Sequence, residues 1–190
     1  IDRDLVKGLR KRFLDQPRFT LGQGDVLNVP LTLPDGHPAN KVVANIPYNI
    51  TGPLLEKLLG RLNRPVERKY QLLILLLQKE VADRITARPG DKCFSSLSVR
   101  LQLMAVCRKV CSVPPRCFDP PPKVQSEVIA IEPFTSEKLI DPLLARRTET
   151  LLKKAFLSRR KMLRNTLRDI CPLEKLELIA QSVGICLQQR

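Results

Sequence analysis

The chain has 190 residues, of which 43% are hydrophobic and 27% are charged, and its formal net charge is +14 at pH 7. This balance excludes a disordered chain and indicates a folded protein of one domain or one and a half. The positive charge favours a polyanionic partner, most often a nucleic acid, although a basic proteome background would also produce it. Aromatic residues make up only 4% of the chain, which disfavours a protein that stacks successive bases of a single strand.

Six cysteines and one histidine are spread along the chain. No two cysteines form a Cys-x-x-Cys pair, and His37 lies in a segment rich in proline and glycine. We therefore expect no metal and free cytosolic thiols. The apolar run at 72–77 is far shorter than a membrane span, and no signal peptide is visible, so we expect a cytoplasmic location and no membrane partner.

The first forty residues predict a helix, a strand and a loop. Apolar residues four apart predict an amphipathic helix at 4–14. Residues 18–21 alternate like a strand that ends in a loop of glycine and aspartate. Asp25 lies in that loop, where it either accepts hydrogen bonds from a ligand amine or is an ordinary turn residue. A loop rich in proline and glycine follows at 31–40.

The next segment predicts a strand, a turn and a helix. Residues 42–44 are small and apolar, as at the end of a buried parallel strand. Thr51 is expected to cap a helix whose leucines share one face. In open α/β sheets, ligands bind beyond the carboxyl ends of the strands. The turn at 45–48 would therefore lie at a ligand site.

The turn Asn45-Ile46-Pro47-Tyr48 resembles the catalytic motif of methyltransferases that modify exocyclic amines of bases. The amino nitrogen of adenine is a poor nucleophile because its lone pair is delocalised into the ring. The side-chain carbonyl of Asn45 and the backbone carbonyl of Ile46 would accept the two amine hydrogens and aim the lone pair. Pro47 fixes the direction of the Ile46 carbonyl, and Tyr48 offers a π-face. The alternative is a plain proline turn between a strand and a helix.

The remainder of the chain divides at residue 136. Before it, apolar patterns predict a strand at 70–77, helices at 78–87 and 95–104, and strands at 106–113 and 124–131. A stiff proline-rich loop joins the last two strands without a crossover helix, so they must be antiparallel neighbours. After residue 136 only helical periodicity occurs. We expect an α/β catalytic part at 1–135 and a small all-α, RNA-binding part at 136–190.

The all-α part carries half of the excess positive charge. Residues 138–190 contain 12 Lys/Arg and 5 Asp/Glu. The alternative to an RNA-binding role is a solvated helix face. The expected RNA contacts are Lys123 of the proline-rich loop and Lys153, Lys154, Arg159, Arg160, Lys161 and Arg164.

Four motifs, in order, resemble those of the KsgA-type rRNA adenine dimethyltransferases. They are Asn45-Ile-Pro-Tyr-Asn-Ile, Phe94-Ser-Ser-Leu-Ser-Val, Phe118-Asp-Pro-Pro-Pro-Lys-Val-Gln-Ser and Phe156-Leu-Ser-Arg-Arg-Lys-Met-Leu-Arg-Asn-Thr-Leu. The resemblance runs through essentially the whole chain. The triple proline is more similar to the housekeeping ribosomal enzyme than to its antibiotic-resistance relatives.

The resemblance implies a doubly wound, Rossmann-like methyltransferase sheet followed by a small helical domain. It implies S-adenosylmethionine as methyl donor and, as substrate, two adjacent adenines in the 3′-terminal hairpin of small-subunit rRNA in the pre-small ribosomal subunit. Asp25 and Val26 would hold the donor's adenine, and Asn45 would lie between the donor and the target amine. Phe118 would stack on the flipped-out adenine. We expect the enzyme to act as a monomer.

One departure from the family pattern concerns the start of the chain. In the family, a glycine-rich donor loop, an acidic residue that binds the ribose and the central strand precede the point where this sequence begins. We therefore expect part of a longer enzyme, with a gap in the sheet between 18–21 and 42–44. We also expect an incomplete helical domain and poor donor binding by residues 1–190 alone.

Three functions remain open at this point. The first is dimethylation of small-subunit rRNA, and the second is methylation of the large-subunit site of the resistance enzymes. The third is a non-catalytic RNA-binding assembly factor. The turn at 45–48 together with Phe118 favours catalysis, because a pure binder needs neither.

Overall fold

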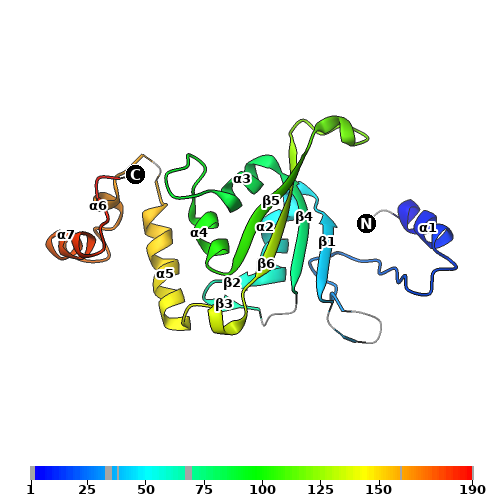
Figure 1. Cartoon of the computed structure of the whole chain (residues 1–190), viewed down its shortest axis with the longest axis horizontal. Helices are drawn as coiled ribbons and strands as arrows, with labels where there is room; N and C mark the ends of the chain where they lie inside the picture. Colours follow the sequence, from blue (N-terminus) through cyan, green and yellow to red (C-terminus); the bar gives the residue numbers. More distant parts are fainter. Residues whose placement is uncertain (1–2, 33–35, 38, 67–69, 159, 190) are drawn as a thin grey trace.

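The computed structural model describes residues 3–32, 36–37, 39–66, 70–158 and 160–189. A mixed sheet forms its centre, with α1 (Arg3–Arg12) at one end of the molecule and α7 (Leu173–Ser182) at the other (Figure 1). This arrangement confirms the expected α/β class, with helices alone after residue 136.

Four strands form the central sheet. Their order across it is β1 (Lys41–Asn45), β4 (Leu72–Gln78), β6 (Ser126–Pro133) and β5 (Ala105–Val113). β1 and β4 are parallel, whereas β6 is antiparallel to both of its neighbours. A separate hairpin contains β2 (Gly60–Arg61) and β3 (Arg64–Pro65). The expected parallel strand and the expected antiparallel pair are both confirmed.

The hydrophobic core lies around β4, whose sequence is almost entirely leucine and isoleucine. Leu73, Leu75 and Leu77 have no exposed surface. Side chains of α2 (Thr51–Leu59), α3 (Lys79–Thr86) and α4 (Ser96–Gln102) pack into this core. The leucines that the sequence placed on one face of α2 are all buried, which confirms that prediction. Figure 1 shows α3 and α4 between the sheet and α5.

The first described strand differs from its expectation. β1 forms where a buried strand was predicted, but Val43 is 81% exposed. Residues 18–21, expected as a strand, form none. A strand needs a ladder partner, and among the described residues no further strand follows β1 at that edge of the sheet. Instead the ring of Phe19 stacks on that of Phe13, with centroids 4.4 Å apart.

Helix starts follow local hydrogen bonding. Ser95 caps α4, in a capping box with Ser98. Thr51 was expected to cap α2, but the cap position is Ile50 and Thr51 is the first helical residue. The reason is that a 3-10 turn, η1 (Tyr48–Ile50), runs directly into α2. The Thr51 hydroxyl donates to the Tyr48 carbonyl at 3.3 Å and ties the two together.

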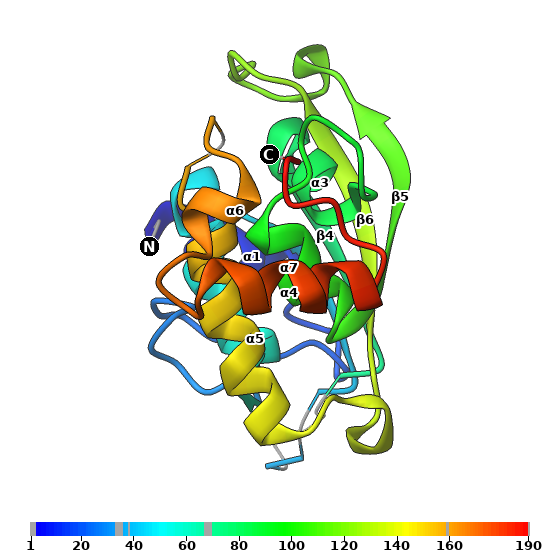
Figure 2. The same ribbon diagram turned by 90° about the vertical axis from the view of Figure 1, so that its left-hand side faces the viewer.

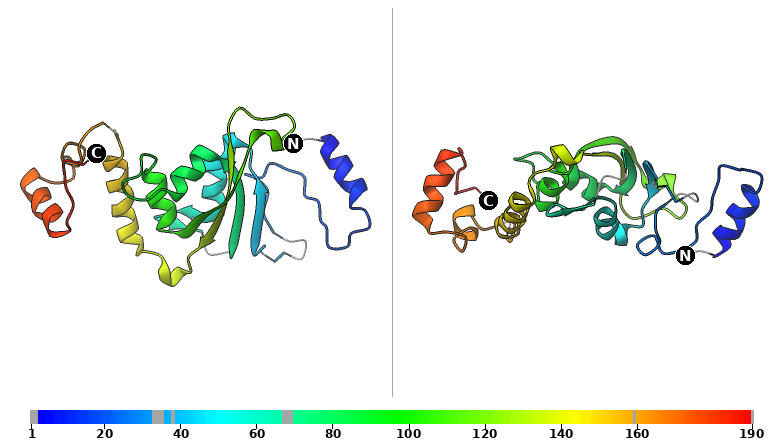
Figure 3. Two further views of the ribbon diagram at one scale, coloured as in Figure 1. Left: turned by 45° about the horizontal axis from the view of Figure 1, so that its top comes forward. Right: turned by 90° about the horizontal axis from the view of Figure 1, so that it is seen from below.

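The helical segment begins with η3 (Ser136–Lys138) and continues through α5 (Pro142–Ala155), α6 (Leu163–Thr166) and α7. Asp141 caps α5 by accepting from the backbone N–H groups of Leu143 and Leu144, at 2.8 and 3.1 Å. Figures 1 and 3 show α6 and α7 beyond α5, and Figure 2, seen from that side, shows α7 in front of α4. Ala145 of α5 is fully buried in the same core as the sheet. The division into two domains at 135/136 therefore stays a prediction.

Three general expectations concern the cysteines, membrane spans and metal sites. All six cysteines are free, as expected, and burial raises the pKa of Cys107 to about 12, so its thiol stays protonated. Within the described ranges, no helix is long and apolar enough to cross a membrane. The same residues contain no group of three His, Cys, Asp or Glu side chains placed to hold a metal ion.

Candidate active site

One edge of the sheet carries most of the expected site. Asn45 ends β1 opposite Leu76, near the carboxyl end of β4. Ser126 begins β6 opposite Gln78, and it also faces Val113 at the end of β5. The turn at 45–48 and the loop between β5 and β6 therefore lie at the same edge. This is the carboxyl edge of the parallel strands, where α/β sheets bind ligands.

The turn is anchored by its second residue. The Ile46 side chain is 1% exposed, and its N–H donates to the Leu76 carbonyl at 3.3 Å. Asn45 and Pro47, on either side, are exposed. Pro47 holds φ at −55° and ψ at 131°, an extended conformation that fixes the peptide before the helix. The turn thus has a buried anchor and a solvent-facing amide side chain.

Tyr48 is held by a residue that sequence reasoning missed. Its hydroxyl lies 2.7 Å from the Ser126 hydroxyl, and Ser126 is fully buried at the start of β6. A buried hydroxyl needs a hydrogen-bond partner, so the pair ties the turn to the central sheet. The orientation of the Tyr48 ring is therefore fixed from its far end. Ser126 closes the third motif of the sequence, which was the available signal.

Phe118 lies in the loop between β5 and β6, directly after η2 (Pro115–Cys117). Its N–H donates to the Pro115 carbonyl at 3.1 Å, and its side chain is half-buried. It does not belong to the buried cluster around β4, nor to the partly buried side chains packed against that cluster. Among the described aromatic residues, neither Phe118 nor Tyr48 stacks on another ring.

Asp25 is exposed in a tight turn and is occupied in part by that turn. Its carboxylate accepts from the Leu27 N–H at 2.9 Å and from the Asn28 amide at 2.7 Å. The adjacent Val26 packs against the core. Lys57 of α2 donates to backbone carbonyls of this turn. Sequence reasoning missed Lys57, because its partners lie about thirty residues earlier.

The expected RNA-binding residues differ in their surroundings. Lys154 pairs with Asp169 at 2.8 Å, and the hydrogen bond from Lys154 lowers the pKa of Asp169. Part of the Lys154 charge is thus already balanced within the chain. Arg159 lies outside the described residues. The other five are exposed: Lys123, Lys153, Arg160, Lys161 and Arg164.

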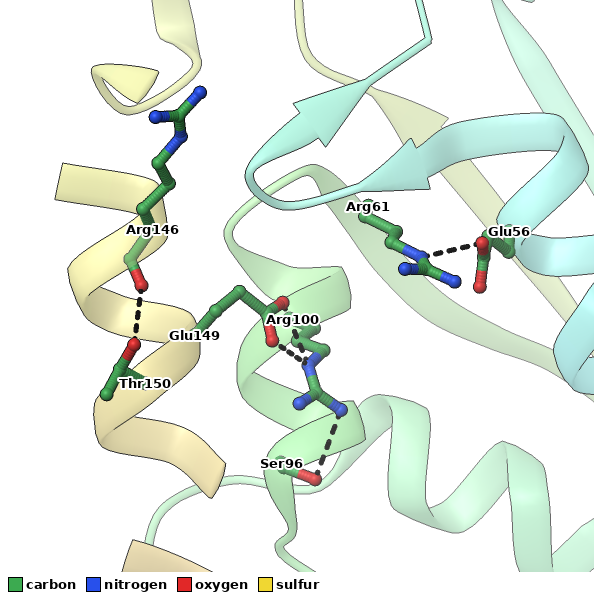
Figure 4. A network of polar contacts seen from close by, with 7 residues as sticks. All are labelled: Glu56, Arg61, Ser96, Arg100, Arg146, Glu149 and Thr150. Atoms are coloured by element: carbon green, nitrogen blue, oxygen red, sulfur yellow. Dashed lines mark hydrogen bonds and ion pairs between the residues drawn. The ribbon is translucent and has the colours of Figure 1, made fainter. Parts of the chain in front are cut away.

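A cavity of about 550 Å³ lies between the turn at 45–48 and helix α5. Tyr48 and Lys153 both line it. Its walls carry two ion pairs, Glu56–Arg61 at 2.7 Å and Arg100–Glu149 at 3.0 Å (Figure 4). Both carboxylate oxygens of Glu149 accept from the Arg100 Nε, which fastens α5 to α4. The remaining lining residues are Thr51, Gly52, Leu55, Gly60, Leu62, Asn63, Val81, Leu97, Leu101 and Met104.

Known structures share this architecture. A crystal structure of a dimethyladenosine transferase from Plasmodium falciparum matches with a TM-score of 0.76 and 25% identity, covering all of this chain and 74% of the other. The structure of the 23S rRNA methyltransferase ErmE matches with a TM-score of 0.75 at 23% identity, covering all of this chain and 72% of the other. The second likeness supports the fold alone. The sheet and its helices thus form a Rossmann-like methyltransferase fold.

Sequence comparison specifies the class further. Residues 1–189 match the family described as "Ribosomal RNA adenine dimethylase", and the chain belongs to that family. It is 68% identical over 190 residues to "Ribosomal RNA small subunit methyltransferase A" of Prochlorococcus marinus strain MIT 9303. It is 66% identical to the protein of the same description from Synechococcus sp. strain WH7803. Each match covers all of this chain and 68% of the relative. The resemblance drawn from the four motifs is confirmed.

Proposed function

We propose that this protein transfers methyl groups from S-adenosylmethionine to the N6 amines of two adjacent adenines in the 3′-terminal hairpin of small-subunit rRNA. The product is N6,N6-dimethyladenosine, formed during ribosome biogenesis. The description of relatives up to 68% identical supports the choice of small-subunit rRNA. The observation that carries the chemistry is the exposed Asn45 amide on a turn anchored by the buried Ile46.

The chain's own residues supply orientation rather than acid–base chemistry. The donor provides an electrophilic methyl group on a sulfonium. The Asn45 side-chain carbonyl and the Ile46 backbone carbonyl accept the two amine hydrogens, which aims the nitrogen lone pair at that methyl. The N–C bond forms as the C–S bond breaks, and the electron pair of the broken bond goes to sulfur. The resulting aminium is very acidic and loses its proton to water, so no side chain needs to act as a general base.

The residues present fit the donor at two points. Each carboxylate oxygen of Asp25 accepts one hydrogen bond within the turn, which leaves lone pairs for an amine of the donor's adenine. Asn45 is exposed at the end of β1 and would lie near the sulfonium methyl of the donor. Because Val26 packs against the core, only its backbone would face the donor.

Recognition of the target base would use the two aromatic residues at the same edge. A stacked or paired adenine cannot reach a sulfonium methyl and must leave its stack. Tyr48, fixed by Ser126, would support one face of the base. Phe118, half-buried and outside the core, would support the other. The stabilisation of stacking would offset part of the unstacking cost.

The basic helical segment at 136–190 is proposed to form the rest of the surface that binds RNA. Its exposed cations would contact phosphates of a structured RNA, where shape and backbone dominate recognition. Lys153 lines the cavity that also contains Tyr48, so the same RNA could contact both. We further propose that the protein acts as a cytoplasmic monomer on the pre-small ribosomal subunit.

Mapping of modified adenines tests this function against its alternatives. The protein, expressed from its complete reading frame, is introduced into bacteria that lack their own small-subunit dimethyltransferase. Mass spectrometry of rRNA fragments should then find dimethyladenosine in the terminal hairpin of small-subunit rRNA. Modification of large-subunit rRNA would replace this function with that of the resistance enzymes. Restored subunit assembly without any methylation would indicate a non-catalytic assembly factor.

A further inference from the structure

The turn that carries Asp25 is built from several short contacts. The backbone N–H groups of Asn28 and Val29 both donate to the Asp25 carbonyl at 2.9 Å. A Cβ placed on Gly24 would lie 2.3 Å from a methyl carbon of Val29, so the chain doubles back here with no room for a side chain. The Asp25 carboxylate also accepts hydrogen bonds from within the turn. The direction of the carboxylate is therefore set by the shape of the turn.

Lys57 of α2 contacts the backbone of this turn through its ammonium group. Its ammonium donates to the carbonyl oxygens of Val26 at 2.8 Å and Leu27 at 3.1 Å, and also to that of Val29. An ammonium has three N–H donors, and all three are used on one turn. In the part of the chain that the structure describes, Lys57 forms no ion pair with a carboxylate. The whole charge of this partly buried side chain is directed at backbone carbonyls.

The position of Lys57 connects the two ends of the proposed site. Lys57 belongs to α2, which follows η1 and the turn at 45–48 without a break. The buried leucines of α2 fix that helix in the core. A clamp from α2 to the Asp25 turn therefore sets the position of Asp25 relative to the turn that carries Asn45.

We propose that Lys57 is a positioning residue for the methyl donor, which it serves by holding the Asp25 turn in the shape that binds the donor's adenine. This inference rests on the proposed function, because it assigns Asp25 to the donor. Lys57 contacts the turn and not the reacting atoms. Its loss should therefore weaken donor binding and leave the methyl-transfer step and RNA binding nearly intact.

Donor titration and steady-state kinetics test this inference in the protein expressed from its complete reading frame. Lys57→Met keeps most of the length of the side chain but removes all three charged donors. The loss should raise the donor Kd and KM by about tenfold or more, with kcat at saturating donor and the RNA Kd changed by less than about twofold. Lys57→Arg restores the charge and should recover most of the donor affinity. Lys92→Met, which removes an exposed lysine between α3 and α4, is the control and should change neither the donor Kd and KM nor the RNA Kd.

If Lys57→Met does not fold, Gly24→Ala provides a second test of whether the shape of the turn sets donor affinity. Gly24→Ala leaves Lys57 in place but pushes Val29 out of the turn, so it should also raise the donor Kd. An unchanged donor Kd in a folded Lys57→Met or Gly24→Ala protein would overturn the inference, as would a lower kcat with an unchanged donor KM. Calorimetric titration of the donor needs no rRNA. A wild-type protein that binds donor but leaves small-subunit rRNA unmethylated would refute the proposed function separately.

Discussion

Replacement of Phe118 by alanine separates a base-stacking residue from a packing residue. Stacking of a base on an aromatic ring contributes about 1–3 kcal/mol. If Phe118 supports the flipped adenine, Phe118→Ala should lower kcat/KM by about 5- to 150-fold. Phe118→Tyr keeps the ring and should keep most of the activity.

The stability effect follows from the burial of the side chain. Truncation of a fully buried phenylalanine costs about 3–5 kcal/mol. Phe118 is only half-buried and lies outside the cluster around β4, so about 1–2 kcal/mol is expected. Thermal unfolding measures this change, and kcat/KM is measured on the same folded preparations.

Phe134 is the matched control for this experiment. It is also half-buried, but it follows the far end of β6, at the opposite edge of the sheet. Phe134→Ala should lower stability by a similar amount while kcat/KM changes by less than about twofold. A Phe118→Ala protein that loses about 3–5 kcal/mol of stability with normal kcat/KM would refute the stacking role.

Three further predictions concern the turn, the basic helices and acid stability. Asn45→Ala should lower kcat more than RNA affinity, because the lost acceptor matters most as the amine rehybridises; normal kcat with weakened RNA binding would contradict this. Arg160→Glu with Lys161→Glu should reduce the log–log salt slope of RNA binding by about 0.7–0.9 per lost phosphate contact, and an unchanged slope would mean that these side chains meet only solvent. Burial raises the pKa of Asp83, but hydrogen bonds from two lysines outweigh burial and lower it overall. Its stabilising contribution is therefore present above the unfolded pKa of about 3.9 and is lost as pH falls through the lower folded value. Asp83→Asn should reduce the loss of unfolding free energy between pH 5 and the acid range, measured by urea titration, and an identical pH dependence would refute this.

Periodicity predicted the fold where a segment's own pattern decided its structure. The continuous apolar run of β4 and the leucine face of α2 both formed as expected. Each of these features depends on contacts that any sheet or helix core would supply. The antiparallel pairing of β5 and β6 also followed from the chain, because the proline-rich loop between them offers no crossover helix.

The errors occurred where a distant partner decided the structure. Residues 18–21 alternate like a strand but form none, because no described strand pairs with them. Val43 is exposed for the same reason, since it lies on the outermost strand of the sheet. Thr51 was predicted as the cap of α2 but is its first helical residue, because the preceding 3-10 turn already provides the start of the helix.

The site residues show the same division. The turn at 45–48 and Phe118 could be singled out because their residue types suit one chemistry. Lys57 could not, because it acts through a contact with a segment far away in sequence. Ser126 ends the third motif, but its partner Tyr48 is also far away in sequence. A buried serine and a helix lysine are common residues, so residue type alone gave no reason to select them. Their roles became visible only through hydrogen-bond geometry.

The most direct test of the central claim is methyl transfer in vitro. The protein expressed from its complete reading frame is incubated with S-adenosylmethionine and small ribosomal subunits that lack the modification, and methylated nucleosides are quantified by mass spectrometry. Our account predicts two methyl groups on each of two adjacent adenines in the 3′-terminal hairpin, with almost none formed by the Asn45→Ala variant. Absence of methylation there, with donor binding intact, or equal yields from both proteins, would contradict it.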